Sequence, residues 1–296
     1  MISVIIPTHN RLNRLQNCLR SVLALHHSDY EIIIVNDGST DGTRDWLDHL
    51  DDPKIKVIHH LKNLGQSKAR NTGIGLAGGT LLAFTDDDCI VDSTWLTELE
   101  KIFHNEDCGF VFGATYYISK HYQGYFPERL TSNGGGTWPG GANIAYKKEI
   151  FEKIGTFDSM FDRFHNEDTE IAIRAVARGN AFKRVPGALV FHQPEKWTVQ
   201  SLLSSAKNLS VWPILKSRYP KHYLAFGGPA KWKVSVEPAD YIKIILLPIL
   251  LPILFFRYLY HGKKDFKVFF SKWPCWLLLR RWYIYKEALK NKSFML

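Results

Sequence analysis

Cysteine is scarce in this chain, and the cysteines that are present form no pattern. The 296 residues include four, at Cys18, Cys89, Cys108 and Cys275, and no two of them make a C-x-x-C pair. This spacing indicates neither a disulfide framework nor a zinc site. The chain also enters a strand-like run at once, without a basic leader segment, so we expect no signal peptide. Both features favour the cytoplasm.

Two further absences narrow the function. The turn after the first predicted strand reads PTHNR and contains no G-x-G-x-x-G. A glycine loop therefore does not hold a pyrophosphate there, which disfavours a dinucleotide-dependent oxidoreductase. Long apolar runs are missing too. The uncharged stretch Ile244–Phe256 would rise roughly 20 Å as a helix, less than the ~30 Å hydrocarbon core of a bilayer.

Charge is divided unevenly along the chain. Residues 1–230 hold 25 Lys and Arg against 25 Asp and Glu, whereas residues 231–296 hold 13 against 4. The whole formal charge of +9 therefore lies in the tail, which also holds 15 of the 40 aromatic residues. A neutral body followed by a basic, aromatic tail predicts a catalytic domain at 1–230 and a membrane-associating segment at 231–296.

The tail contains two apolar and aromatic stretches. Ile244–Phe256 is interrupted by Pro248 and Pro252, and Phe266–Tyr285 carries three tryptophans among basic residues. This combination favours a helical element that lies on the cytoplasmic face of a membrane or dips into it over one that spans it. The alternative is a pair of C-terminal helices packed on the domain or in a dimer interface.

Short β-branched runs alternate with stretches of helical spacing in the first half of the chain. The predicted strands are Ile2–Ile6, Glu31–Val35, Lys54–Ile58 and Thr80–Phe84. Continuous apolar strands that alternate with helices predict an α/β fold, with a mainly parallel sheet covered by helices on both faces. Ligands of such sheets bind at the carboxyl ends of the strands. Polar clusters follow the first, second and fourth of these strands.

Three aspartates, Asp86, Asp87 and Asp88, follow the fourth predicted strand. Strand alternation would place Asp86 and Asp88 on one side and Asp87 on the other. Clustered carboxylates repel one another, and a divalent metal with oxygen ligands, Mg²⁺ or Mn²⁺, would relieve this. The alternative is a solvated acidic turn, but a position at the carboxyl end of a strand favours the metal. Asp37 ends the second strand and is a candidate for binding a ribose or base.

Other candidate residues lie further along the chain. Acidic residues open the predicted helix Glu167–Arg178, where they complement the helix dipole, and Asp168 among them could act as a general base. His192 follows a predicted strand and is either structural or a metal ligand. The loop Asn133–Asn143 holds five glycines, which permit close approach to a ligand. Trp138 in this loop could stack on a sugar ring or anchor the loop.

Seven segments of the chain form an ordered set of motifs: SVIIPTHNR, IIIVNDGSTDGT, NLGQSKARNTGI, LLAFTDDD, WPGGANIAYKKEIFEKIGTFD, NEDTEIAIRAVARG and VPGALVFH. This set resembles glycosyltransferase family 2, the inverting enzymes with the GT-A fold. The segments cover about residues 1–195, and their order is more specific than any one of them. The resemblance implies a Rossmann-like sheet and transfer of a sugar from a nucleoside diphosphate, by default a UDP-sugar. The acceptor would be a hydroxyl of a lipid-linked, polysaccharide or protein molecule.

The resemblance also implies roles for individual residues. The donor nucleotide would be bound by Pro7, Thr8, Arg11, Asp37, Lys68, Asp86 and Asp87. The metal, Mn²⁺ or Mg²⁺, would be held by Asp88 and His192, with Asp86 as a further candidate. The catalytic base would be Asp168, with Glu167 beside it. The donor sugar and the acceptor would face Trp138, Gly140, Gly141 and Asn143.

Several other functions compete with this interpretation. The Q-x-x-R-W motif of processive synthases is missing, since the nearest string is QSLL at residues 200–203, so we expect addition of one or a few sugars. A catalytically weak nucleotide-sugar-binding or assembly subunit is disfavoured because Asp88 and Asp168 are both present. A nucleotidyltransferase would show a glycine-rich basic loop after the first strand. A nucleic-acid binder would explain the basic tail but not Ile244–Phe256.

Overall fold

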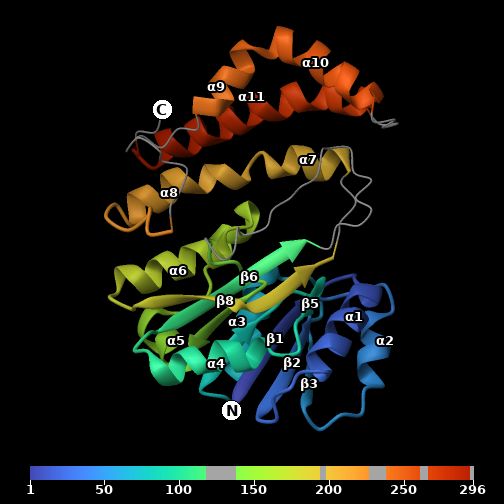
Figure 1. Cartoon of the computed structure of the whole chain (residues 1–296), viewed down its shortest axis with the longest axis vertical. Coiled ribbons are helices and arrows are strands. Elements are labelled where there is room, and N and C mark those ends of the chain that lie inside the picture. The colour runs from blue at the N-terminus through green and yellow to red at the C-terminus, as the bar shows by residue number, and fades with distance from the viewer. Residues whose placement is uncertain (118–137, 194–197, 227–237, 261–265, 294–296) are drawn as a thin grey trace. The chain divides into compact units, whose positions relative to one another are not determined.

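The computed structural model describes residues 1–117, 138–193, 198–226, 238–260 and 266–293 (Figure 1). The chain divides into two compact units. The sheet unit comprises Met1–Ile118, Thr131–Asp162 and Glu167–Pro194. The helical unit comprises Ser119–Leu130, Arg163–Asn166 and Glu195–Leu296. The sheet unit contains all the polar clusters that the sequence singles out.

The described part of the sheet unit contains one sheet of eight strands, in the order β3-β2-β1-β4-β7-β6-β8-β5. The strands are β1 Ile2–Thr8, β2 Tyr30–Asn36, β3 Ile55–His59, β4 Leu81–Phe84, β5 Cys89–Val91, β6 Phe110–Tyr117, β7 Ile144–Lys147 and β8 Phe182–His192. β3, β2, β1 and β4 run parallel, as predicted. β7 is antiparallel to β4 and β6, and β5 is antiparallel to β8, so the sheet as a whole is mixed.

Helices cover both faces of the parallel strands, as the continuous apolar pattern predicts. The helices of this unit are α1 Leu12–Leu23, α2 Thr43–Asp48, α3 Gln66–Leu76, α4 Trp95–Asn105, α5 Lys148–Ile154, the 3-10 helix η1 Ser159–Phe164, part of which belongs to the helical unit, and α6 Glu167–Ala177. Alternate residues of β1 pack in one core with the buried sides of α1 and α4. On the other face, Ile5 lies against Gly73 of α3, where an added Cβ would come within 2.5 Å of Ile5.

A buried asparagine holds the second half of the sheet together. The pairing of β6 with β8 shifts register between Gly113 and Ala114. Asn143, which is fully buried, donates its amide hydrogens to the carbonyls of Ala114 at 3.0 Å and Ala188 at 2.9 Å. Its own carbonyl accepts a hydrogen bond from the indole of Trp95 at 2.8 Å. Asn143 therefore supplies hydrogen bonds at the place where the ladder is interrupted.

We expect Asn143→Ala to destabilise the protein. The indole N–H and two buried carbonyls would lose their partner, and each unsatisfied buried group costs about 1–3 kcal/mol, so we expect a loss of about 3 kcal/mol or more. Urea unfolding of the full chain measures this. Asn105→Ala, at an exposed position, is the matched control and should stay within about 0.5 kcal/mol of the parent. Equal unfolding free energies for the two variants would contradict the role given to Asn143.

The helical unit consists of helices in its described part. They are α7 Val199–Ser205, the 3-10 helix η2 Asn208–Ser210, α8 Val211–Arg218, α9 Pro238–Ile245, α10 Leu247–Tyr260 and α11 Phe266–Lys290. Helix α11 packs against α7, η2 and α8, and also against α9 and α10 (Figure 1). Among the helices that the structure describes, none has both the length and the apolar character required to cross a membrane.

Candidate active site

The three aspartates lie in the turn between β4 and β5, beyond the end of the strand. β4 ends at Phe84, so the alternation of strand side chains does not govern residues 86–88. The expected grouping of Asp86 with Asp88, opposite Asp87, is wrong for this reason. Asp87 and Asp88 both contact Arg11, whereas Asp86 is bound by residues of α3.

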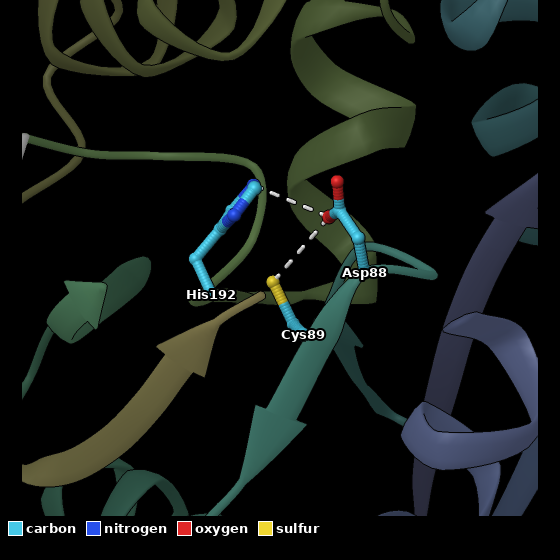
Figure 2. A group of neighbouring side chains, drawn as sticks. All are labelled: Asp88, Cys89 and His192. Atoms are coloured by element: carbon cyan, nitrogen blue, oxygen red, sulfur yellow. Dashed lines mark hydrogen bonds and ion pairs between the residues drawn. The ribbon is translucent and has the colours of Figure 1, made fainter. Parts of the chain in front are cut away.

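Asp88 meets His192 because β5 pairs with β8. In that antiparallel pair Cys89 lies opposite His192, which brings the end of β8 to the aspartate turn. Asp88 is buried, and its Oδ1 lies 3.2 Å from Nε2 of His192 (Figure 2). The two predicted metal ligands therefore come together from positions about a hundred residues apart in the sequence.

The chemistry of this pair fits a divalent cation. Nδ1 of His192 lies 2.8 Å from the carbonyl oxygen of Gln193, which can only accept, so Nδ1 carries the hydrogen. In a neutral ring Nε2 then directs its lone pair toward the carboxylate of Asp88. Two acceptors this close require a proton or a cation, and a histidine oriented by a carbonyl is a common metal ligand. Asp88 and His192 therefore suit a bound metal.

Cys89 lies beside this pair but is a poor ligand. Asp88, Cys89 and His192 offer ligand atoms within 4.8 Å of one another (Figure 2). Burial, and then the charges of Asp86 and Asp88, raise the pKa of the Cys89 thiol well above its ordinary value. A protonated thiol does not bind metal, and Mg²⁺ and Mn²⁺ prefer oxygen ligands. Of the three, Asp88 and His192 fit the predicted metal.

Cationic side chains surround the buried carboxylates. Nη1 of Arg11 lies 2.8 Å from Asp88 and 3.1 Å from Asp87, and Nη1 of Arg14 lies 3.3 Å from Asp88. Thr8, at the end of β1, donates to Asp87 at 2.8 Å. Burial raises the pKa of Asp87 to about 6, with Arg11 opposing the rise, and burial also raises the pKa of Asp88 against the opposing effect of His192. The turn between β4 and β5 thus offers carboxylates to a cation, and the arginines beside it offer guanidinium groups to an anion.

The carboxylate of Asp37 stabilises the turn that precedes α3. It is buried, and its Oδ1 lies 2.7 Å from Nδ1 of His60 and accepts the backbone N–H of Leu64 at 2.9 Å. Its Oδ2 accepts the backbone N–H of Gly65 at 2.9 Å. Lys68, in the first turn of α3, is exposed. The carboxylate of Asp37 is therefore engaged within the protein at the place where the sequence predicts contact with a nucleotide.

Arg70 is a central residue of the site that the motif analysis did not single out. Its side chain is buried, with Nη2 2.8 Å from Asp86 and Nη1 in a short contact with Glu167. Burial alone would lower the pKa of Arg70, but Asp86 and Glu167 hold it above its ordinary value. The sequence does contain a signal for this residue. Arg70 is at helical spacing from Ser67 and Ile74, which share the buried side of α3, and a charged residue at such a position requires a partner.

Asp168 lies in the first turn of α6, next to the pair formed by Arg70 and Glu167. Its Oδ2 accepts the backbone N–H of Gly141 at 2.7 Å, and its Oδ1 accepts that of Thr169 at 2.6 Å. Burial raises the pKa of Asp168, while Arg70 and these backbone donors oppose the rise. The structure thus brings the predicted base to the glycine loop.

The other loop residues differ in what they can offer a substrate. Asn143 is a correction to the prediction, because its amide is buried and donates both hydrogens within the fold, which leaves it no contact with a substrate. Trp138 is half-buried, and Gly140 has open space where a side chain would stand. Residues 133–137 of the predicted loop lie outside the described residues.

Substitution of the two adjacent glycines should separate packing from loop flexibility. A Cβ on Gly141 would lie 2.3 Å from Nη2 of Arg70, whereas a Cβ on Gly140 would meet nothing within 4 Å. We expect Gly141→Ala to lower the free energy of unfolding by about 1–3 kcal/mol through overpacking. Gly140→Ala, the matched control, should change it by less than about 0.5 kcal/mol. Chemical denaturation measures both, and a stable Gly141→Ala would show that Arg70 is not tightly enclosed.

Comparison with known proteins agrees with the motifs. The model of the family described as glycosyl transferase family 2 matches residues 3–182. An uncharacterized glycosyltransferase of Nostoc sp. is 34% identical over 54% of this chain, and EpsJ of Bacillus subtilis, also an uncharacterized glycosyltransferase, is 35% identical over 45%. This chain spans 54% of the length of the first and 39% of the second.

Solved structures share the fold. A mannosyltransferase from Pyrobaculum calidifontis, solved with GDP-Man and Mn²⁺, gives a TM-score of 0.65 at 18% identity, over 96% of this chain and 86% of its own. S. aureus TarS 1–349, solved with UDP-GlcNAc, gives 0.57 at 16%, over 98% and 90%. The expected GT-A fold is thereby confirmed. Because the family model matches more than half of its residues, the chain belongs to glycosyl transferase family 2.

Proposed function

We propose that this chain transfers one sugar from a nucleoside diphosphate, by default UDP, to a hydroxyl of a lipid-linked, polysaccharide or protein acceptor, with inversion. One arrangement carries the proposal. Arg70 pairs both with Asp86, in the turn that contains the Asp88 partner of His192, and with Glu167, the residue next to Asp168, which supports assigning the metal pair and the base to one site. The nucleotide sugars named in two neighbouring structures, GDP-Man and UDP-GlcNAc, support this donor class.

The donor's diphosphate would lie at the aspartate turn. Asp88 and His192 would hold Mn²⁺ or Mg²⁺, which when bound supplies positive charge to the leaving diphosphate. The side chains of Arg11 and Arg14 are 36% and 26% exposed, so both are accessible to a donor that arrives from solvent. Both contact Asp88, and with a cation held by Asp88 they would be available to bind phosphate oxygens.

Asp168 would act as the general base. The N–H of Gly141 holds one carboxylate oxygen in place, and the ion pair between Glu167 and Arg70 fixes the start of α6. Asp168 would take the proton of the acceptor hydroxyl while the hydroxyl oxygen forms a bond to the anomeric carbon. The bond from that carbon to the diphosphate breaks on the opposite face, so the configuration inverts and no covalent enzyme intermediate forms.

Nucleotide binding should depend on metal and on Asp88. We expect UDP or GDP with Mn²⁺ to raise the melting temperature of the full chain, since a ligand at a hundredfold its Kd stabilises by about 2.7 kcal/mol. Asp88→Ala should abolish the metal-dependent part of the shift. Asp107→Asn, at an exposed carboxylate, is the control and should keep it. A shift that is the same with and without metal would contradict the assigned metal site.

Asp168→Asn should separate binding from turnover. The amide keeps the size of the carboxylate but cannot take a proton, so we expect about 10²–10⁴-fold slower transfer. The metal-dependent melting shift should persist, because Asp168 does not touch the aspartate turn through any contact that the structure describes. Glu152→Gln, at an exposed position, controls for the loss of one charge. Radiolabelled sugar transfer measures the rate, and near-parental turnover would exclude Asp168 as the base.

A further inference from the structure

The helical unit exposes an apolar stripe along α9 and α10. The exposed fractions are 55% for Ile242, 74% for Ile245, 38% for Leu246, 61% for Ile249, 57% for Ile253 and 68% for Phe256. Ile245 and Leu246 are adjacent at the junction of the two helices, and the other positions follow at steps of three or four residues, which places the set on one side of a helical path. A continuous exposed apolar surface of this kind marks an interaction site. We call these six residues the α9–α10 stripe.

The opposite side of α9 is already occupied by α11. Asp240 is fully buried and forms ion pairs with Arg280 at 3.1 Å and Arg281 at 2.7 Å. At 3.6 residues per turn, Asp240 and Ile242 point roughly 200° apart around the helix. The ion pairs hold the Asp240 side of α9 against α11, which lies beside it (Figure 1), and Ile242 is on the other side of the helix. The side of α9 that carries Ile242 is therefore the side available to a partner.

The charge around the stripe indicates what the partner is. No charged residue occurs from Ile244 to Phe256, while Lys243, at the edge of the stripe, is exposed. The surrounding segment, residues 231–296, carries 13 basic against 4 acidic residues. An apolar stripe with an exposed lysine at its edge, in a segment of net positive charge, complements a surface that is apolar inside and anionic outside, which is the interface of a bilayer with acidic headgroups.

We propose that the α9–α10 stripe binds the surface of an anionic membrane, with α9 and α10 lying in the plane of the interface. The isoleucines and Phe256 enter the boundary between headgroups and acyl chains, and the exposed Lys243 at the edge of the stripe contacts a lipid phosphate. This proposal concerns where the chain resides and does not rest on the sugar-transfer reaction.

Vesicle cosedimentation of the full chain tests the proposal. The parent should sediment with vesicles of phosphatidylcholine and phosphatidylglycerol, and about tenfold less with phosphatidylcholine alone or at high salt. The variant I245E/I249E/I253E places carboxylates in the stripe and should bind the anionic vesicles at least about tenfold more weakly. Leu61→Glu is the matched control, because Leu61 is 97% exposed in the sheet unit, and it should bind like the parent.

Three results would overturn the proposal. They are failure of the folded parent to sediment with anionic vesicles, unchanged binding of the triple variant, and a lipid-free dimer that the triple variant dissociates. The last result would mean that the stripe joins two copies of the chain. Circular dichroism and the metal-dependent nucleotide shift should be retained in the triple variant, which shows that lost sedimentation reflects the stripe. A missing nucleotide shift in the parent would count against the transferase proposal alone.

Discussion

The site depends on one buried cation. Arg70 has almost no solvent exposure, and a guanidinium in that position is tolerated only when carboxylates pair with it. Its partners come from two distant segments, Asp86 from the turn after β4 and Glu167 from the start of α6. The position of the proposed base is therefore coupled to the position of the aspartate turn, because movement of either segment would remove one of the two carboxylates that pair with the buried guanidinium.

Gly141 meets two demands that the same interaction creates. It allows the guanidinium of Arg70 to pack against the backbone, and its N–H binds Asp168. A side chain at this position would displace the cation, while the loss of its backbone position would release the base. Gly140 has no such constraint. Of these two adjacent glycines, only Gly141 is at a position where the surrounding packing excludes a side chain.

Local patterns in the sequence predict the parallel strands and the edge at which the polar residues gather, because both follow from neighbouring residues. The meeting of Asp88 with His192 depends on the pairing of β5 with β8, which no local pattern specifies. The prediction for the side chains of residues 86–88 is wrong because strand alternation ends where β4 ends, at Phe84. Asn143 shows a different limit, since a polar residue in a motif serves a β-ladder irregularity as readily as a substrate.

Composition and packing divide the chain at different places for a physical reason. The excess charge begins near residue 231, yet α7 and α8, which precede it, form one compact unit with α11. Packing between helices determines the extent of the helical unit, whereas the excess charge of the tail reflects the surface that it meets. The one fully buried carboxylate of the described tail, Asp240, pairs with Arg280 and Arg281, so few acidic groups remain to neutralise the other basic residues. The tail therefore keeps a net positive charge, which suits the anionic surface proposed as its partner.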